Sequence, residues 1–336
     1  ASIWMLLAAL IAAGQGAATA ASQALDQRFA TALDVDPLYI NFTSGSTGTP
    51  KGVAVCHRSV IDFIPQFDSV FGIGQDDRIG NQAPFDFDVS VKDIYSTLFT
   101  GATLVLIPRD YFSQPAKLMD FLADNAITTC TWAVSAMCFV SIMGGFDYRV
   151  PETIDKVIFS GEVMPPKQLA KWRRALPNAT FVNVYGPTEV TCNCTYHVVD
   201  REYAKDEVIP AGKPFFNEGV FLLDDDALVT QPGAEGEVCV TGTCLALGYY
   251  NDPQRPATAF VTTASSVRAA CTTRSARKSR FITMACLPPM RCLSCFPRSF
   301  RIIWCLRSLF LLNICRSPRT AKSIAQHLRR WAVRNE

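Results

Sequence analysis

Between residues 36 and 261, short segments rich in β-branched and aromatic residues alternate with segments of helical periodicity. A helix between two strands gives the chain enough length to return to the same edge of a sheet, so such strands usually lie parallel. The expected strands include residues 38–42, 103–107, 156–159 and 180–184, and the expected helices include residues 116–125 and 165–175. This alternation predicts an α/β fold with a mostly parallel sheet and flanking helices.

The pattern changes after about residue 209. Residues 220–224 and 237–240 have the composition of strands, and polar turns such as Pro232-Gly233 separate the segments. Strands joined by short turns pair in antiparallel fashion. We therefore expect a small antiparallel sheet or barrel after the α/β region.

Charge divides the chain into two unequal parts. Residues 1–262 contain 17 Lys and Arg against 29 Asp and Glu, whereas residues 263–336 contain 15 against one, with six cysteines and no glycine. Such a segment repels itself and has few turn residues. We expect residues 263–336 to be a disordered or non-native tail, produced by a shifted reading frame or a misjoined gene model. The alternative is a genuine basic tail that seeks membranes.

The remaining composition is that of a cytoplasmic globular protein. Apolar residues make up 49% of the chain and charged residues 18%. Cys130, Cys138 and Cys239 stand singly among apolar residues, as small buried side chains do in a reducing cytosol. The apolar run at residues 3–13 is too short to span a bilayer, and no basic residue precedes it. We expect neither a membrane nor a nucleic acid as a partner.

A loop rich in Gly, Ser and Thr separates two apolar segments. It has the sequence Thr43-Ser-Gly-Ser-Thr-Gly-Thr-Pro-Lys51-Gly52. Glycines allow the backbone to approach a ligand closely, successive N–H groups can surround an anion, and Lys51 supplies a positive charge. The loop does not match the Walker pattern of P-loop enzymes. It therefore predicts a phosphate-binding loop of another kind, the alternative being an ordinary surface loop.

This loop resembles the signature of the adenylate-forming superfamily. The resemblance continues in order through Phe87-Asp88-Val89-Ser90, Phe159-Ser-Gly-Glu162, Asn183-Val-Tyr-Gly-Pro-Thr-Glu189 and the segment from Gly236 to Tyr249. It covers about residues 36–262. Residues 81–90 and 161–165 most resemble D-alanine–carrier protein ligases and the amino acid adenylation domains of nonribosomal peptide synthetases.

The resemblance implies a site for ATP and Mg²⁺. The flat ring of Tyr185 suits adenine, and Thr188 and Glu189 offer hard oxygen ligands for Mg²⁺. The residues implied for catalysis are Lys51, Thr188 and Glu189, of which Thr188 and Glu189 also hold the metal. Those implied for ATP binding are Thr43, Ser44, Gly45, Ser46, Thr47, Gly48, Ser160, Gly161, Glu162, Asn183, Tyr185 and Gly186.

Asp88 distinguishes between the substrates that the superfamily activates. Amino-acid-activating members have an aspartate here that pairs with the α-ammonium group, and fatty-acid activators lack it. The residues implied for the side-chain pocket are Val89, Lys92, Thr131, Ile158, Ser160, Val184, Cys192 and Asn193. Ser160 and Lys92 depart from the D-alanine ligase pattern. Lys92 could bind a substrate carboxylate, but its spacing from Asp88 also fits a helical ion pair, and it could turn to solvent.

The expected function is ATP-dependent activation of an amino acid as its aminoacyl adenylate, for transfer to the phosphopantetheine thiol of a carrier protein. The alternatives are an acyl-CoA ligase, which Asp88 disfavours, and a catalytically defective nucleotide-binding remnant. The remnant is considered because the family's ribose-binding Tyr-x-Thr-Gly-Asp motif and C-terminal lid are missing from the sequence. The expected organisation is a remnant of a first subdomain (1–35), an α/β subdomain that binds ATP and the amino acid (36–205), a β-rich subdomain (206–262) and the tail (263–336).

Overall fold

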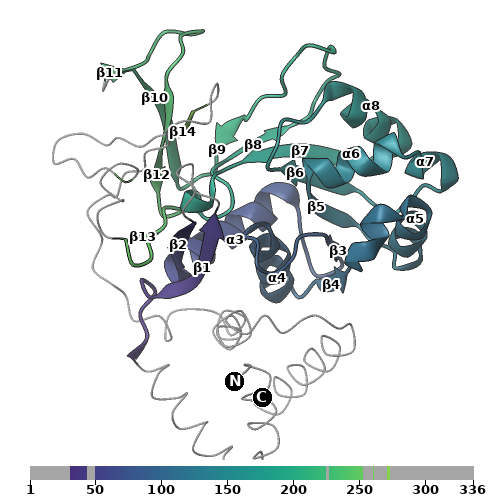
Figure 1. Cartoon of the computed structure of the whole chain (residues 1–336), viewed down its shortest axis with the longest axis horizontal. Coiled ribbons are helices and arrows are strands. Elements are labelled where there is room, and N and C mark those ends of the chain that lie inside the picture. Colours follow the sequence, from purple (N-terminus) through teal and green to yellow (C-terminus); the bar gives the residue numbers. More distant parts are fainter. Residues whose placement is uncertain (1–30, 44–49, 225–226, 253–259, 261–270, 273–336) are drawn as a thin grey trace, which may run out of the picture.

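The computed structural model of the chain describes residues 31–43, 50–224, 227–252, 260 and 271–272 (Figure 1). The first 30 residues, residues 44–49 of the phosphate loop and almost all of the basic tail lie outside this part. The expectations about those segments therefore remain predictions, as does the division into domains.

The largest sheet has seven strands in the order β4-β3-β5-β6-β7-β8-β9. The neighbours from β4 to β7 are parallel, and β8 and β9 continue the sheet in antiparallel fashion. The strands are β3 (Arg78–Asn81), β4 (Thr103–Leu106), β5 (Thr129–Ala133), β6 (Lys156–Ser160), β7 (Thr180–Tyr185), β8 (Thr195–Val198) and β9 (Lys213–Pro214). This sheet confirms the predicted α/β fold.

Helices cover both faces of this sheet and divide the apolar core in two (Figure 1). Strand β6 shows the division, because successive side chains of a strand point to opposite faces. Ile158 packs in one core with α3 and α4, whereas Val157 and Phe159 pack in the other with α5, α6 and α8. The helical elements are α3 (His57–Phe71), α4 (Val89–Thr100), η1 (Arg109–Ser113), α5 (Pro115–Asp124), α6 (Val134–Ile142), α7 (Gly145–Tyr148), α8 (Pro166–Ala175) and η2 (Thr188–Val190).

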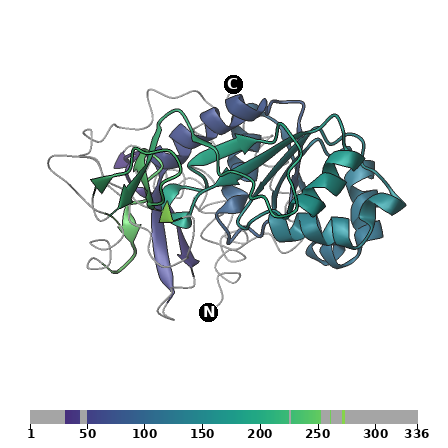
Figure 2. The same ribbon diagram turned by 90° about the horizontal axis from the view of Figure 1, so that it is seen from above.

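Two small antiparallel sheets complete the described fold. One has the order β1-β2-β13 and the other the order β11-β10-β12-β14. Figure 2 shows their green and purple strands toward one end of the molecule and the teal helices toward the other. The strands are β1 (Pro37–Thr43), β2 (Lys51–Cys56), β10 (Glu218–Asp224), β11 (Ala227–Leu228), β12 (Glu237–Gly242), β13 (Gly248–Tyr249) and β14 (Cys271–Thr272). The second sheet confirms the predicted antiparallel sheet.

The strand predicted at residues 38–42 is present, but it lies outside the parallel sheet. Strand β1 pairs with β2 in antiparallel fashion, from Pro37 opposite Cys56 to Thr43 opposite Lys51, and does not join the parallel sheet. The connection is shorter than the dozen or so residues that a parallel crossover requires, so the two strands form a hairpin. Strand β13 then adds to β2, with Gly248 opposite Ala54.

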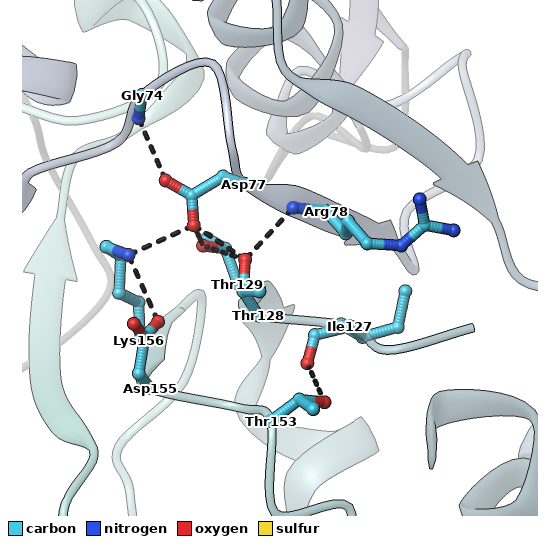
Figure 3. A network of polar contacts seen from close by, with 9 residues as sticks. All are labelled: Gly74, Asp77, Arg78, Ile127, Thr128, Thr129, Thr153, Asp155 and Lys156. Atoms are coloured by element: carbon cyan, nitrogen blue, oxygen red, sulfur yellow. Dashed lines mark hydrogen bonds and ion pairs between the residues drawn. The ribbon is translucent and has the colours of Figure 1, made fainter. Parts of the chain in front are cut away.

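A polar network ties the amino ends of three parallel strands together (Figure 3). The hydroxyl groups of Thr128 and Thr129 donate hydrogen bonds of 2.6 and 2.8 Å to Asp77 Oδ1, and Lys156 Nζ lies 3.0 Å from the same oxygen. The Gly74 N–H donates to Asp77 Oδ2 at 2.8 Å. Burial acts to raise the pKa of Asp77, but these hydrogen bonds outweigh it and hold the pKa below its usual value.

The helices of the described part include none that is long and apolar enough to cross a membrane. All seven cysteines among residues 1–262 lie in this part and are free thiols. Six of them are buried.

Candidate active site

Two of the sequence motifs lie at the carboxyl ends of neighbouring parallel strands. Strand β6 ends at Ser160 and continues into Gly161-Glu162, and strand β7 ends at Tyr185 and continues into Gly186-Pro187. Gly161 has a φ of +92°, a conformation that side chains with a Cβ rarely adopt. Open α/β sheets bind their ligands outside the carboxyl ends of their strands. The fold therefore brings these motifs to the edge where a ligand site is expected.

Glu189 is the point at which three segments of the chain meet. It lies in η2, just after the β7 turn, and is 8% exposed. The hydroxyl group of Tyr249 in β13 donates a hydrogen bond of 2.8 Å to Glu189 Oε1, and Lys51 Nζ at the start of β2 lies 3.8 Å from the same oxygen. Lys51 Nζ also lies 5.1 Å from the centre of the Tyr249 ring. The fold thus joins the end of the phosphate loop to the Tyr-Gly-Pro-Thr-Glu motif.

The predicted phosphate loop lies in the sequence between β1 and β2. Thr43 and Lys51 face each other at the last pair of the ladder. Ser44, Gly45, Ser46, Thr47 and Gly48 lie outside the described residues. Their contacts with phosphate therefore remain predictions.

The residues around Glu189 fit a magnesium ion that is held partly by substrate. Glu189 Oε2 has no hydrogen-bond partner in the described part of the chain, and the Thr188 hydroxyl group is on the neighbouring residue. The same part has no cluster of three or more His, Cys, Asp or Glu side chains that could hold a metal alone. Mg²⁺ is usually bound through one or two carboxylates together with phosphates of the substrate. One carboxylate beside a phosphate loop matches this arrangement.

Asn183 and Tyr185, two of the residues predicted to bind ATP, already have partners in the fold. Asn183 Nδ2 donates to the Pro210 carbonyl oxygen at 2.8 Å, and the Tyr185 carbonyl oxygen accepts from the Cys194 N–H at 2.8 Å. The ring of Tyr185 is only partly buried. These contacts fix the end of β7, and they leave the adenine-binding roles as predictions.

The predicted substrate residues on the sheet face one side of it. Ile158 and Val184 lie in the core that contains α3 and α4, and Ser160 shares the face of Ile158 because it is two residues further along β6. Thr131 on β5 donates a hydrogen bond to Asp93 of α4. The structure therefore brings these four residues to one face of three adjacent strands, the face that packs against α3 and α4.

Asp88 lies immediately before the first residue of α4, Val89. Its backbone carbonyl oxygen accepts a hydrogen bond from the Cys192 thiol at 3.2 Å. Within the described residues, no cation lies within ion-pair distance of its carboxylate, which is partly exposed. The backbone of Asp88 is thus fixed beside Cys192, and its carboxylate has no ion-pair partner in the described residues.

The structure contradicts two of the alternatives considered for Lys92, exposure to solvent and an ion pair with Asp88. It is 1% exposed, so it does not turn to solvent, and it forms no ion pair with Asp88. Instead its Nζ donates to Asn193 Oδ1 at 2.7 Å and lies 5.9 Å from the centre of the Phe67 ring. Burial lowers the pKa of Lys92, although Cys192, Asp93 and Asp88 act in the opposite direction. Helical spacing was misleading because the buried acceptor comes from a segment 101 residues away.

Asp93 is a buried residue of this region that sequence motifs did not single out. It is 1% exposed, and its carboxylate accepts hydrogen bonds from Asn81 Nδ2, at 2.8 Å, and from Thr131. Burial raises the pKa of Asp93 to about 7, against the effects of the Asn81 hydrogen bond and the Lys92 charge. The available signal was a pair of adjacent charges, Lys92-Asp93, within an otherwise uncharged helix.

The nucleotide motif and the substrate residues are also in direct backbone contact. A Cβ atom on Gly186 would lie 2.5 Å from Asn193 Cα and 2.8 Å from the Cys192 carbonyl oxygen. Only glycine allows the turn after β7 to pack this closely on that segment. This contact links the position of Glu189 to that of Asn193.

Parallel strands with motifs at their carboxyl edge are typical of α/β proteins that bind ligands at that edge. Comparison with known proteins agrees with this class. The family model of AMP-binding enzymes matches residues 8–250, and the chain therefore belongs to that family of adenylate-forming ligases. Membership implies the use of ATP.

The chain is similar to proteins of two kinds within this family. It is 33% identical over 225 residues to a D-alanine–D-alanyl carrier protein ligase of Bacillus cereus (strain G9842). The aligned region covers 66% of this chain and 44% of the ligase. It is 34% identical over 226 residues to tyrocidine synthase 2 of Brevibacillus parabrevis. Here the aligned region covers 67% of this chain and 6% of the synthase. The chain thus spans less than half the length of these relatives.

Solved structures give the same result for the fold. The chain resembles a nonribosomal peptide synthetase, FmoA3, with a TM-score of 0.64 and 29% identity over 71% of this chain and 26% of the synthetase. A form of the same synthetase with bound α-methyl-L-serine-AMP gives a TM-score of 0.64 and 30% identity over 70% of this chain and 27% of the synthetase.

Proposed function

We propose that this chain is the nucleotide- and amino-acid-binding core of a ligase that activates an amino acid as its aminoacyl adenylate. In this reaction the substrate carboxylate forms a bond to the α-phosphorus of ATP, and pyrophosphate leaves. The phosphopantetheine thiol of a carrier protein then attacks the acyl carbon, which forms a thioester and releases AMP. The observation that carries the proposal is the convergence of Lys51, Glu189 and Tyr249 from three distant segments.

Lys51 and Glu189 have complementary tasks in this reaction. A carboxylate and a triphosphate repel each other, so a nearby cation is needed to bring them together. Lys51 supplies that charge at the end of the phosphate loop. Tyr249 fixes Glu189 through Oε1, which leaves Oε2 and the Thr188 hydroxyl group to hold Mg²⁺. Bound there, the metal supplies charge for the departing pyrophosphate.

Asp88 supports an amino acid as the acid that is activated. A carboxylate without a protein cation in the described part of the chain is suited to a ligand ammonium group. Thr131, Ser160 and Val184 on the sheet, with Val89 on α4, would surround the rest of the substrate. A fatty or aryl acid has no group that would pair with Asp88, so this residue argues against an acyl-CoA ligase.

Pyrophosphate exchange tests the proposed reaction. The full chain is incubated with ATP, Mg²⁺ and labelled pyrophosphate, and with each of a panel of amino acids, fatty acids and aryl acids. We expect label to enter ATP only with one amino acid or a few related ones. Asp88→Asn should abolish this exchange, whereas Asp76→Asn, at an exposed aspartate, should not.

The other outcomes would contradict the proposal in different ways. Exchange only with fatty or aryl acids would indicate an acyl-CoA ligase. ATP binding, measured by calorimetry, without exchange for any acid would indicate a nucleotide-binding chain that does not catalyse adenylation.

A further inference from the structure

We infer that the proposed substrate site selects an amino acid whose side chain carries a carboxylate, and that Lys92 is the residue that binds it. This inference rests on the proposed function and adds the substrate class to it. Its basis is that the Lys92 side chain is buried and has no carboxylate partner in the described residues.

The amino group of Lys92 is buried and has few partners. An ammonium group has three N–H donors, and Nζ of Lys92 makes one hydrogen bond, to the neutral amide of Asn193. Within the described residues, no carboxylate lies within ion-pair distance of it. A buried charge is strongly unfavourable unless it is paired and hydrogen-bonded. Lys92 is therefore a donor group that lacks an anion.

The adjacent aspartate does not supply that anion. Asp93 follows Lys92 on α4, so its side chain points about 100° away around the helix. Its two carboxylate oxygens accept hydrogen bonds from Thr131 and from Asn81. Asp93 lowers the electrostatic cost of the buried lysine without occupying its donors.

The surroundings of Lys92 place its donors in the proposed substrate site. Its hydrogen-bond acceptor, Asn193, and its neighbours Cys192 and Asp88 are all residues of that site. Phe67 covers it from α3. The open donors of Nζ are therefore beside the position proposed for the substrate.

Asp88 and Lys92 together suit a ligand with two charges of opposite sign. They are four residues apart at the start of α4, which is about one helical turn or roughly 5–6 Å. Asp88 would bind the α-ammonium group, and Lys92 would bind a carboxylate further along the substrate. Glutamate, aspartate and 2-aminoadipate have this arrangement. A substrate with an apolar side chain would leave the lysine buried and unpaired.

Calorimetric titration of amino acids tests this inference. The full chain is first saturated with Mg²⁺ and a non-hydrolysable ATP analogue, and then titrated with glutamate, aspartate, 2-aminoadipate, glutamine, asparagine, alanine and leucine. We expect at least one acidic amino acid to bind ~30-fold or more tightly than alanine and than its own amide, as expected for a buried charged pair. Lys92→Met should remove this preference without changing the affinity for the ATP analogue.

Lys167→Met serves as the matched control, because Lys167 is exposed on α8. It should leave the preference for acidic amino acids unchanged. Lys92→Gln is a second variant that keeps a hydrogen-bond donor without the charge, and it too should lose the preference.

Three results would contradict the inference. Tighter binding of alanine or leucine than of every acidic amino acid would overturn it and leave the proposed function intact. A preference for acidic amino acids that persists in both Lys92 variants would show that another residue binds the carboxylate. Binding of the ATP analogue without binding of any amino acid would overturn the inference and also count against the proposed function.

Discussion

Glu189 is held in place by groups that the chain brings from far away. Tyr249 is 60 residues distant in the sequence, and both Tyr249 and Lys51 contact the same carboxylate oxygen. The consequence is that Glu189 presents its second oxygen in a fixed direction. A residue held in this way can bind a metal without reorganising when the substrate arrives.

Glu189→Gln tests the metal-binding role at the scale of one residue. Glutamine keeps an oxygen that accepts the Tyr249 hydrogen bond, but it loses the charge that Mg²⁺ requires. We expect the affinity for Mg·ATP to fall about tenfold or more, and the affinity for metal-free AMP to change by less than about threefold. Calorimetry with the two ligands measures both effects. The control is Glu152→Gln at an exposed glutamate. Equal losses for Mg·ATP and AMP would exclude Glu189 from the metal site.

Asp93 should make the free energy of unfolding depend on pH, and the direction of that dependence follows from its raised pKa. Burial raises the pKa of Asp93 to about 7, so the folded state holds its proton more tightly than the unfolded state does. The contribution of Asp93 to the free energy of unfolding should therefore fall as pH rises from about 4 to about 7.

Asp93→Asn isolates this contribution from that of other buried carboxyl groups. Asp68 and Glu218 also have pKa values raised to about 7 by burial, but they are unchanged in the variant. The free energy of unfolding of the wild type, minus that of the variant, should be smaller at pH 8 than at pH 5 in urea titrations. The same difference at both pH values would show that Asp93 is not the buried, proton-holding group described here.

At the scale of elements, the turn between β7 and η2 depends on the absence of a side chain at Gly186. A Cβ there would meet the backbone of Asn193 and Cys192, which cannot rotate away as a side chain would. Gly186→Ala should therefore destabilise the protein by about 1–3 kcal/mol. Displacement of η2 should also weaken the binding of Mg·ATP.

Gly74→Ala is the matched control for this substitution. Nothing lies within 4 Å of the Cβ that it would introduce, and the N–H that binds Asp77 remains. Thermal unfolding and calorimetry would compare the two variants. If both behaved alike, the close contact between Gly186 and the segment containing Asn193 would not be a feature of the folded protein.

Asp77 joins the amino ends of β3, β5 and β6 at the edge opposite the proposed site (Figure 3). Its pKa lies below the usual value, so its stabilising contribution is present above the pKa of the unfolded state, about 4, and is lost as pH falls. Asp77→Asn should lower the free energy of unfolding by about 2 kcal/mol at pH 7, and by less at pH 3. Asp155→Asn is the control, because the Asp155 side chain is 59% exposed and its ion pair with Lys156 contributes little. A loss for Asp77→Asn that does not depend on pH would contradict the account of this network.

The sequence predicted the elements better than their pairing. The segments at 103–107, 156–159 and 180–184 are strands β4, β6 and β7, because each is an apolar run between polar turns. The separate β1–β2–β13 sheet was not predicted. Strand β13 has only two residues, and its partner lies almost 200 positions earlier in the chain. A contact of that range leaves no periodic signal in the sequence.

The same limit applies to the candidate site. Motifs predicted Lys51, Asp88 and Glu189 as site residues, because their residue types and order resemble a known family, and these roles stay predictions. The contacts of Lys92 with Asn193 and of Tyr249 with Glu189 depend on how distant segments pack, and they became visible only in the fold. Asp93 was missed because a charge beside another charge on a helix usually belongs to a solvated face.

At the scale of the whole molecule, the fold places Lys51, which ends the predicted phosphate loop, the hydrogen-bonded carboxylate of Glu189 and the unpaired carboxylate of Asp88 along one edge of the described α/β core. The residues predicted to bind the nucleotide come from β2, β6 and β7, and those predicted to bind the substrate come from α4 and from the sheet. The two sets touch at the contact of Gly186 with Asn193. This arrangement would hold a nucleotide and an amino acid together, as the proposed reaction requires.

The most direct test of this account follows the oxygen atoms of the substrate. The full chain is incubated with ATP, Mg²⁺, hydroxylamine as acyl acceptor, and a mixture of amino acids whose α-carboxylates carry ¹⁸O. If the carboxylate bonds to the α-phosphorus, transfer of the acyl group leaves one labelled oxygen in AMP, which mass spectrometry detects. We predict labelled AMP that disappears when the amino acids are omitted. Unlabelled AMP, or label in inorganic phosphate with release of ADP, would contradict the proposed adenylation.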